Sequence, residues 1–400
     1  VQHRVVPLQL VRVEPGDTAG ANLAVALDIG TTTVCAELVD LKTGSVMAET
    51  AEYNRQAECG EDVITRIVHA QKPEGQAKLQ TLVISTVNQV IDQLMEQSGA
   101  TKKSISCIVG AGNTTMTHLL LGMETRYIRE APYVPVANFM PLIWASRVGI
   151  DVPDCVQLFS FPAVASYVGG DIVAGVMGSG MYRTEELTLY MDIGTNAEIV
   201  IGNKDWLACA ACSAGPAFEG GGIKLGMRAT EGAIEDFSID PLTLEPMNIT
   251  IGSVRPKGIC GSGLITAVAT MFEMDIIDNL GKFNRNLSTD RIRETDGICE
   301  YVLAWTAETQ IDRDVVLTEP DIENLIRAKG AMYSGCMTLL EEVGLSVQDI
   351  DRIIIAGGFG SYVDLEKAMT IGLLPETDPE KVTFIGNGSL MGARMSSLTN

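Results

Sequence analysis

The feature that most constrains this chain is a short turn motif that occurs twice. The four residues Asp-Ile-Gly-Thr stand at positions 28–31 and again at positions 192–195. Each copy lies between two apolar runs that read as strands, expected over residues 23–27, 34–39, 187–191 and 197–201. Two similar segments that each begin with strand, turn and strand indicate an internal duplication.

The elements that follow each copy also recur in the same order. After the first copy we expect a returning strand over 45–50, an amphipathic helix over about 76–97, and a strand over 105–109 that leads into 110–113. After the second copy we expect a helix over about 321–343 and a strand over 351–356 that leads into 357–360. The chain therefore has the pattern of two α/β halves.

A single Asp-x-Gly-Thr hairpin would be an ordinary turn, because Asp and Gly favour tight reversals and Thr favours strands. Two copies that begin two similar halves favour a phosphate clamp instead. In that interpretation backbone N–H groups and Thr hydroxyls donate to phosphate oxygens, and a divalent cation lies between Asp28 and Asp192. The bare glycine corner at 357–360 leaves room for a purine and its ribose.

Charge and cysteine content limit the partners and the compartment. The chain has 29 Lys and Arg against 51 Asp and Glu, a formal net charge of −22, and no basic run. Nucleic acids and anionic membranes bind clustered cations, so we expect neither as a partner. No apolar run reaches the ~18 residues of a spanning helix. The nine cysteines lack a framework spacing, which favours reduced thiols and a cytoplasmic location.

The repeated segments resemble the phosphate-one, phosphate-two and adenosine motifs of the actin, sugar-kinase and heat-shock ATPase superfamily. Residues 168–175 and 384–393 resemble its two connecting helices, and residues 326–331 resemble a helix whose basic side chain lies along the base. The resemblance, which covers about residues 23–395, implies an α/β, duplicated, two-lobed actin-like ATPase fold with a nucleotide cleft between the lobes. We expect residues 1–22 to end a preceding domain or to form a linker. Lobe I then covers 23–187, and lobe II, with the adenosine motif, covers 188–400.

Four further segments resemble a narrower group, the C-terminal ATPase domain of the reductive activators of corrinoid proteins. These segments are residues 110–116, 131–133, 213–220 and 258–263. The resemblance implies an ATPase that helps to return cob(II)alamin to cob(I)alamin on a corrinoid protein of a methyltransferase system. That family carries a ferredoxin-like [2Fe–2S] domain at its N-terminus, and this chain has no four-cysteine spacing of that type. The electron would therefore come from a partner or from such a domain. We also expect a homodimer.

The resemblance and the chemistry of the side chains together assign roles to individual residues. Asp28 and Asp192 should hold waters of a Mg²⁺ that bridges the ATP phosphates, and Asp171 is our candidate to orient the attacking water, although it suits a helix N-cap equally well. The expected phosphate donors are Gly30, Thr31, Thr32, Thr33, Gly194, Thr195 and Asn196. The expected contacts to the nucleoside or phosphates are Gly215, Lys329, Gly357, Gly358 and Phe359.

Alternative functions rest mainly on the cysteines. Cys209 and Cys212 form one C-x-x-C pair, which supplies only two metal ligands and reads more simply as two small residues on a strand. Around Cys212 the sequence also resembles activators of 2-hydroxyacyl-CoA dehydratases, in which Cys212 and Cys260 of two subunits would share a [4Fe–4S] cluster. A nucleotide-dependent assembly protein is a further alternative. A small-molecule kinase would need a substrate pocket with a catalytic Asp, and the sequence identifies none.

Overall fold

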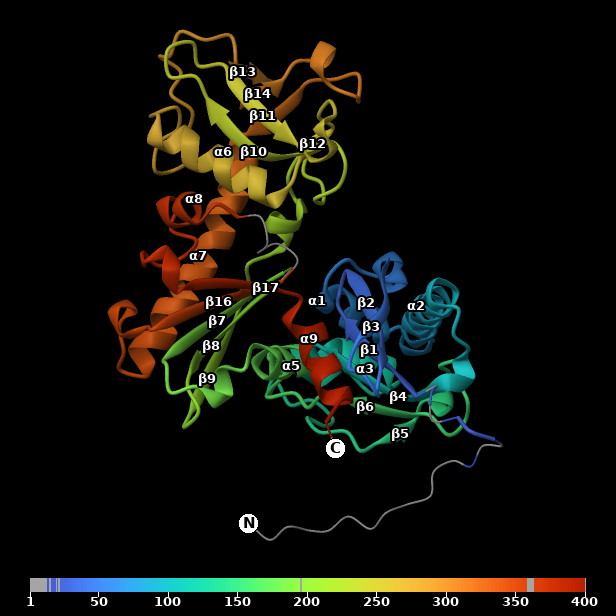
Figure 1. Ribbon diagram of the computed structural model, residues 1–400. Coiled ribbons are helices and arrows are strands. Elements are labelled where there is room, and N and C mark those ends of the chain that lie inside the picture. Colours follow the sequence, from blue (N-terminus) through green and yellow to red (C-terminus); the bar gives the residue numbers. More distant parts are fainter. Residues whose placement is uncertain are drawn as a thin grey trace. The chain divides into compact units, whose positions relative to one another are not determined.

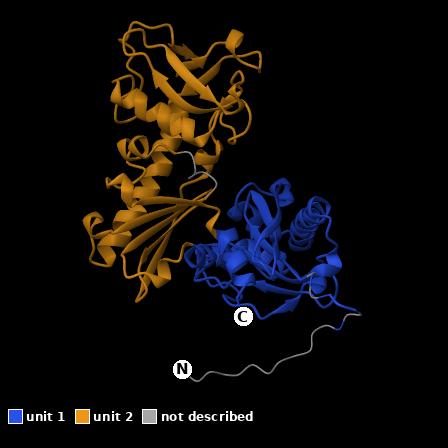
Figure 2. Ribbon diagram, viewed as in Figure 1, with its two compact units in different colours: residues 1–178, 389–400 blue, residues 179–388 orange. Residues whose placement is uncertain are grey.

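The computed structural model describes residues 13, 16–18, 20, 22–194, 196–357 and 363–399 of the chain. These residues form two compact units, unit 1 from Val1–Gly178 with Ser389–Asn400, and unit 2 from Ser179–Gly388 (Figures 1 and 2). The C-terminal segment thus belongs to unit 1, whereas lobe II was expected to run to residue 400. The expected division between lobes I and II at residues 187 and 188 stays a prediction, and most of the expected segment 1–22 lies outside the described residues.

Unit 1 is built on a sheet with the strand order β3-β2-β1-β4-β6-β5. The strands are β1 Leu23–Ile29, β2 Thr33–Asp40, β3 Val46–Tyr53, β4 Ile105–Gly112, β5 Ile143–Trp144 and β6 Gln157–Ser160. β2 runs antiparallel to both β1 and β3, which confirms the expected hairpin and its returning strand, and β4 runs parallel to β1. The helices of this unit are α1 Val63–Ala70, α2 Gly75–Ser98, α3 Thr114–Leu120 and α4 Arg126–Arg129, together with most of α5 Gly170–Ser179 and of α9 Gly388–Ser397.

Unit 2 repeats this topology in its main sheet, which has the order β17-β16-β7-β8-β9. The strands are β7 Thr188–Ile193, β8 Ala197–Gly202, β9 Leu207–Cys212, β16 Arg352–Ala356 and β17 Val382–Gly386. β8 runs antiparallel to β7, while β16 runs parallel to β7, as β2 and β4 do on either side of β1. The shared order and strand directions confirm the duplication expected from the sequence.

Unit 2 also contains two small three-stranded sheets that unit 1 lacks among the described residues. Their orders are β11-β10-β12 and β13-β14-β15. The strands are β10 Ala233–Ile239, β11 Pro246–Thr250, β12 Gly258–Ile259, β13 Ile292–Thr295, β14 Ile298–Ala304 and β15 Val315–Thr318. The helices are α6 Gly261–Glu273, α7 Glu319–Glu342 and α8 Leu365–Thr370. One continuous apolar core joins β7 and β8 to α6, α7 and both small sheets.

The two faces of β1 are covered by different helices, because successive side chains of a strand point to opposite sides. Leu23, Val25 and Leu27 belong to the apolar cluster that contains the buried face of α2. Ala24 and Ala26 belong to a second cluster, which contains residues of α5 and α9. Their small side chains let these two helices approach the sheet closely. The even-numbered positions of β1 thus face α5 and α9, and Asp28 is the next even-numbered position.

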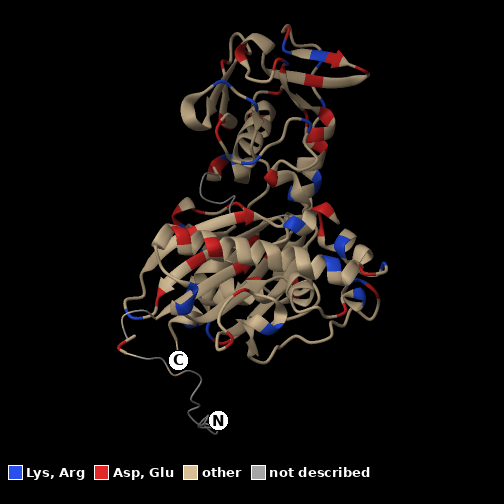
Figure 3. Cartoon of the chain, turned by 90° about the vertical axis from the view of Figure 1, so that its right-hand side faces the viewer, with Lys and Arg blue, Asp and Glu red and all other residues tan. Residues whose placement is uncertain are grey.

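The helix boundaries follow the sequence patterns closely. The periodic run expected as a helix over 76–97 is α2, and α7 begins two residues before the expected position 321. Thr318 caps α7 in a capping box with Asp321, where each side chain binds the other's backbone N–H group. Asp and Glu occur along both units (Figure 3), in keeping with the net charge of −22. Within the described residues, no helix combines the length and apolar character needed to cross a membrane.

Candidate functional site

The first Asp-Ile-Gly-Thr motif forms the tight turn between β1 and β2. Gly30 closes the turn by donating its N–H group to the carbonyl oxygen of Thr33, at 3.0 Å. A Cβ atom at Gly30 would stand 2.6 Å from that same oxygen, so only glycine fits here. Thr31 is buried, while Thr32 and Thr33 are half-buried. A tight turn that carries one carboxylate and three Thr residues combines an oxygen acceptor for magnesium-bound water with hydroxyl groups that can donate to phosphate oxygens.

Two asparagines that were not among the predicted site residues brace this turn from behind. Asn54 follows β3 and is fully buried; its Nδ2 donates to the carbonyl oxygen of Gly30 at 2.9 Å, and its backbone N–H donates to that of Thr32 at 2.9 Å. Asn113 caps α3, and its Nδ2 donates to Oγ1 of Thr31 at 3.0 Å. The turn is therefore held in a fixed shape before any ligand binds. A sequence signal existed for Asn113, which has the position of an N-cap directly after a glycine-ended strand.

Asp171 lies in the first turn of α5, which begins one residue earlier at Gly170. Its Oδ1 accepts a hydrogen bond from the N–H group of Ile172 at 2.9 Å. A Cβ atom at Gly169 would stand 2.4 Å from Cα of Asn113, so the start of α5 packs against the residue that braces the first turn. This places Asp171 in the neighbourhood of the first hairpin, within the same unit. Its role toward water stays a prediction.

The second motif forms the equivalent turn between β7 and β8. Asp192 pairs with Ala356 of the parallel strand β16, just as Asp28 pairs with Ala111 of β4. Gly194 donates its N–H group to the carbonyl oxygen of Asn196 at 3.0 Å. The two aspartates therefore occupy corresponding positions in the two sheets. Thr195 lies outside the described residues.

The structure brings Gly357 directly against this second hairpin. Its φ of +101° is a backbone conformation that favours glycine. A Cβ atom there would stand 2.3 Å from the carbonyl oxygen of Ile193 and 3.2 Å from Oδ1 of Asp192. A side chain at Gly357 would thus collide with the end of β7 itself, in addition to filling any space for a nucleoside. Gly358 and Phe359 lie outside the described residues.

Lys329 and Gly215 lie elsewhere in unit 2. Lys329, on α7, lines a hollow of about 140 Å³ together with residues of α6 and α8, among them Phe272 and Thr370. Its apolar walls and few polar groups suit a flat ligand of the size of a nucleobase. Gly215 precedes the 3-10 turn Pro216–Glu219 and has a φ of +76° with open space around it.

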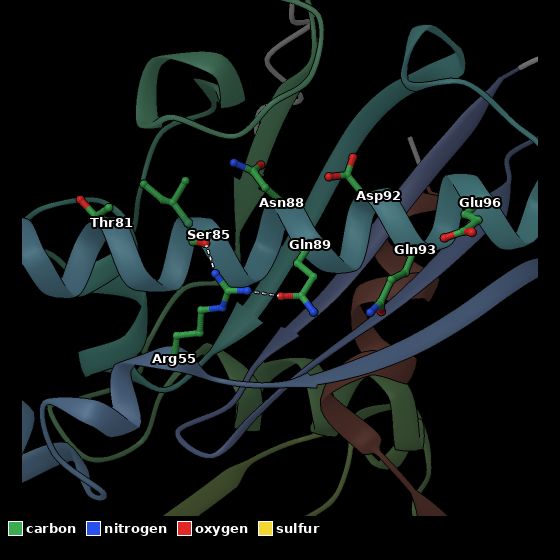
Figure 4. Close-up of a pocket in the computed structure, with 9 residues that line it drawn as sticks. Arg55, Thr81, Ser85, Asn88, Gln89, Asp92, Gln93 and Glu96 are labelled. Atoms are coloured by element: carbon green, nitrogen blue, oxygen red, sulfur yellow. Dashed lines mark hydrogen bonds between the residues drawn. The ribbon is translucent and has the colours of Figure 1, made fainter.

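Another hollow, of about 580 Å³, lies along the outer side of α2 (Figure 4). Its lining is polar and comes from one face of α2 and from Arg55. The guanidinium of Arg55 donates to Oγ of Ser85 at 2.7 Å and to Oε1 of Gln89 at 2.6 Å. The one cation of this lining is thus engaged by the helix, and the hollow shares no residue with either hairpin. We assign it no function.

The cysteine-based alternatives find little support in the geometry. Cys209 and Cys212 are three residues apart on β9, so their side chains point to opposite faces of the strand. Cys212 and Cys260 are only 7% and 2% exposed, whereas a cluster shared between two subunits needs thiols at the surface. Burial raises the pKa of the Cys212 thiol, which disfavours the thiolate that binds iron. Among the described residues, no three His, Cys, Asp or Glu side chains gather as metal ligands.

Comparison with known proteins gives the same family over almost the whole chain. Residues 23–184 match the family described as the RACo middle region, and residues 186–400 match the C-terminal domain of RACo, the ASKHA domain. The solved structure of a reductive activator for corrinoid, iron-sulfur protein superposes with a TM-score of 0.88 at 49% identity. The match covers 96% of this chain and 61% of the chain in that structure.

Two curated relatives agree with this assignment. The corrinoid activation enzyme RamQ of Eubacterium limosum is 33% identical over 390 residues, which are 94% of this chain and 64% of the relative. The Co(II) methylated amine-specific corrinoid protein reductase of Methanosarcina barkeri is 25% identical over 410 residues, which are 92% of this chain and 69% of the relative. The chain therefore spans about two thirds of the length of these relatives. It belongs to the RACo family and contains that family's middle region and its C-terminal ASKHA domain, the actin-like ATPase fold expected from the sequence.

Proposed function

We propose that this chain binds and hydrolyses MgATP and couples nucleotide binding to the reduction of cob(II)alamin to cob(I)alamin on a corrinoid protein. The observation that carries the proposal is the pair of equivalent hairpins. Each places an aspartate at the end of the first strand of its sheet, opposite an alanine of the parallel neighbour. The names of the relatives supply the corrinoid protein as the partner class.

The residues of the two hairpins have different roles in the proposed binding of MgATP. Asp28 and Asp192 would hold waters of a magnesium ion, while backbone N–H groups and Thr hydroxyls would donate to phosphate oxygens. When bound, the magnesium ion neutralises charge on the phosphates. Asn54 and Asn113 fix the first turn in advance, so that little ordering is needed when the nucleotide binds. Lys329 and its hollow on α7 hold the base.

Coupling to reduction requires that the nucleotide-bound form bind the corrinoid protein differently from the nucleotide-free form. One electron converts cobalt(II) to cobalt(I), and an iron–sulfur donor, on a partner or on a ferredoxin-like N-terminal domain, would supply it. This transfer is uphill for such a donor. The binding free energy of the nucleotide contributes to it by favouring a complex in which the cobalt accepts the electron more readily.

Calorimetric titration tests the proposal most directly. The chain is titrated with MgATP, first alone and then in the presence of a corrinoid protein loaded with cob(II)alamin. We expect binding in both titrations and a different affinity in the second, because coupling between two ligands is reciprocal. Binding that the corrinoid protein leaves unchanged would contradict the coupling, and absence of any ATP binding would contradict the whole proposal.

A pair of matched variants tests the role of the second hairpin. Asp192→Ala should abolish ATP hydrolysis while the protein stays folded. Asp205→Ala removes an exposed aspartate from the turn between β8 and β9 and should hydrolyse ATP normally. Circular dichroism establishes that both variants are folded. Undiminished turnover in Asp192→Ala would overturn the metal assignment.

A further inference from the structure

The first aspartate of the proposed magnesium site meets a side chain from the far end of the chain. Asp28 lies on the face of β1 that α5 and α9 cover, and Ser389 lies in the first turn of α9. Oγ of Ser389 donates a hydrogen bond to Oδ1 of Asp28, at 2.9 Å, across 361 residues of sequence. Ser389 is only 4% exposed, so bulk water competes little for this hydroxyl.

Two further contacts fix α9, and with it Ser389, on unit 1. A Cβ atom at Gly392 would stand 1.9 Å from the carbonyl oxygen of Ala174, which shows that α9 and α5 pack with their backbones in contact. Two residues later, Arg394 binds the carboxylate of Glu37 on β2, with N–O distances of 3.1 and 3.3 Å. The contacts of Gly392 and Arg394 therefore set the position of α9 independently of the hydrogen bond between the Ser389 hydroxyl and Asp28.

The residue before Ser389, Gly388, lies beside the hydroxyl of Tyr190, which donates a hydrogen bond to Asp192. The chain passes from unit 2 to unit 1 between Gly388 and Ser389. A Cβ atom at Gly388 would stand 2.6 Å from the hydroxyl oxygen of Tyr190, and that hydroxyl donates to Oδ2 of Asp192 at 3.4 Å. Within unit 2, Gly388 therefore belongs to the surroundings of Asp192.

We propose that Ser389 is a positioning residue for Asp28 in magnesium binding. A carboxylate that is held at one oxygen cannot turn freely about its own axis, so its orientation would already be set when a magnesium ion binds. This inference rests on the proposed function, because it assumes that Asp28 serves a magnesium-bound phosphate. It assigns a task to the crossover residue 389, whose sequence suggested only the start of a connecting helix.

The inference is tested by how ATP binding depends on Mg²⁺. ATP is titrated calorimetrically at a series of MgCl₂ concentrations and in excess EDTA, using the whole chain. A hydrogen bond to a charged group contributes enough for its loss to change affinity about tenfold or more. We therefore expect Ser389→Ala to need about tenfold more Mg²⁺ for half of the metal-dependent gain in ATP affinity. Binding of metal-free ATP should stay as in the wild type, which a merely structural defect would not leave unchanged.

Two other variants keep the test decisive. Ser389→Cys retains the shape of the side chain but donates only weakly, so its Mg²⁺ requirement should lie between those of the wild type and Ser389→Ala. It also serves if the alanine variant does not fold. Ser397→Ala is the matched control, because Ser397 lies on the same helix and donates to the carbonyl oxygen of Arg394. Its Mg²⁺ requirement should be unchanged.

The possible outcomes separate this inference from the proposed function. If wild-type protein binds MgATP and Ser389→Ala or Ser389→Cys has the wild-type Mg²⁺ requirement, the positioning role is refuted and the proposed function stands. If binding of metal-free ATP falls as much as binding of MgATP, Ser389 is structural and the inference is likewise refuted. If the wild type binds no ATP at all, both the proposed function and this inference fail.

Discussion

The packing of α9 on α5 leads to a sharp prediction about two glycines in helices. In an open helix, replacement of Gly by Ala stabilises the fold by about 1 kcal/mol, because Ala loses less backbone freedom on folding. At Gly330 on α7, no described atom other than those of the adjacent residues and of the local helix backbone lies within 4 Å of the place where a Cβ atom would stand. We therefore expect Gly330→Ala to raise the free energy of unfolding by about 1 kcal/mol.

At Gly392 the same substitution should have the opposite sign. Its Cβ atom would stand 1.9 Å from the carbonyl oxygen of Ala174 and 2.7 Å from the Cα atom of that residue. Carbon atoms in contact prefer about 3.5–4.0 Å, so α9 and α5 would have to move apart by more than ~1 Å. Overpacking typically costs about 1–3 kcal/mol, and the upper end applies because the obstacle is backbone. After the helical gain of about 1 kcal/mol, the net loss is about 2 kcal/mol.

Thermal unfolding followed by circular dichroism measures both effects. For a unit of this size, 1 kcal/mol shifts Tm by about 2–4 °C, so Gly392→Ala should lower the Tm of unit 1 by about 4–8 °C and Gly330→Ala should raise that of unit 2 by about 2–4 °C. Two-unit proteins often unfold in more than one step, and the assignment is made by which step moves. Equal or greater stability of Gly392→Ala would refute the close packing of α9.

Two further predictions concern buried polar groups of unit 1. Asn54→Ala removes the side-chain amide that donates to Gly30 behind the first hairpin. It should cost about 1–3 kcal/mol of unfolding free energy and weaken MgATP binding, as measured by urea unfolding and calorimetry. The control Asn88→Ala, whose side chain binds the exposed segment at Gly149, should change both by little; equal losses would contradict the bracing role. Burial lowers the pKa of His118 from its ordinary value near 6.5. Below that pH the unfolded chain takes up a proton that the folded chain does not, so stability should fall as the pH drops below 6.5. His118→Gln should make the urea midpoint less dependent on pH between about 7.5 and about 5.5; an unchanged dependence would refute this explanation.

The local conformations of this protein could be predicted because their signals are local. A turn of Asp, Gly and Thr between apolar strands needs only a few neighbouring residues to form, which is why both hairpins were found at positions 28–31 and 192–195. The length of α2 followed from its periodicity, since a helix with one buried face must repeat its apolar residues every three or four positions. The duplication followed from the two hairpins together, and the equal strand orders of the two sheets confirm it.

Only the tertiary structure decided which buried groups are in contact with each other. Ser389 and Asp28 are 361 residues apart, and nothing in the sequence around either one specifies the other as a partner. Their contact depends on which face of β1 carries Asp28 and on which helix covers that face. In the same way, the sequence contains a glycine at position 357 but does not give the reason for it. The reason is the packing of β16 beside β7, because the end of β7 occupies the space that a side chain at position 357 would need. Local sequence fixes periodicity and turns through neighbouring residues, whereas contacts between distant elements depend on how whole elements pack.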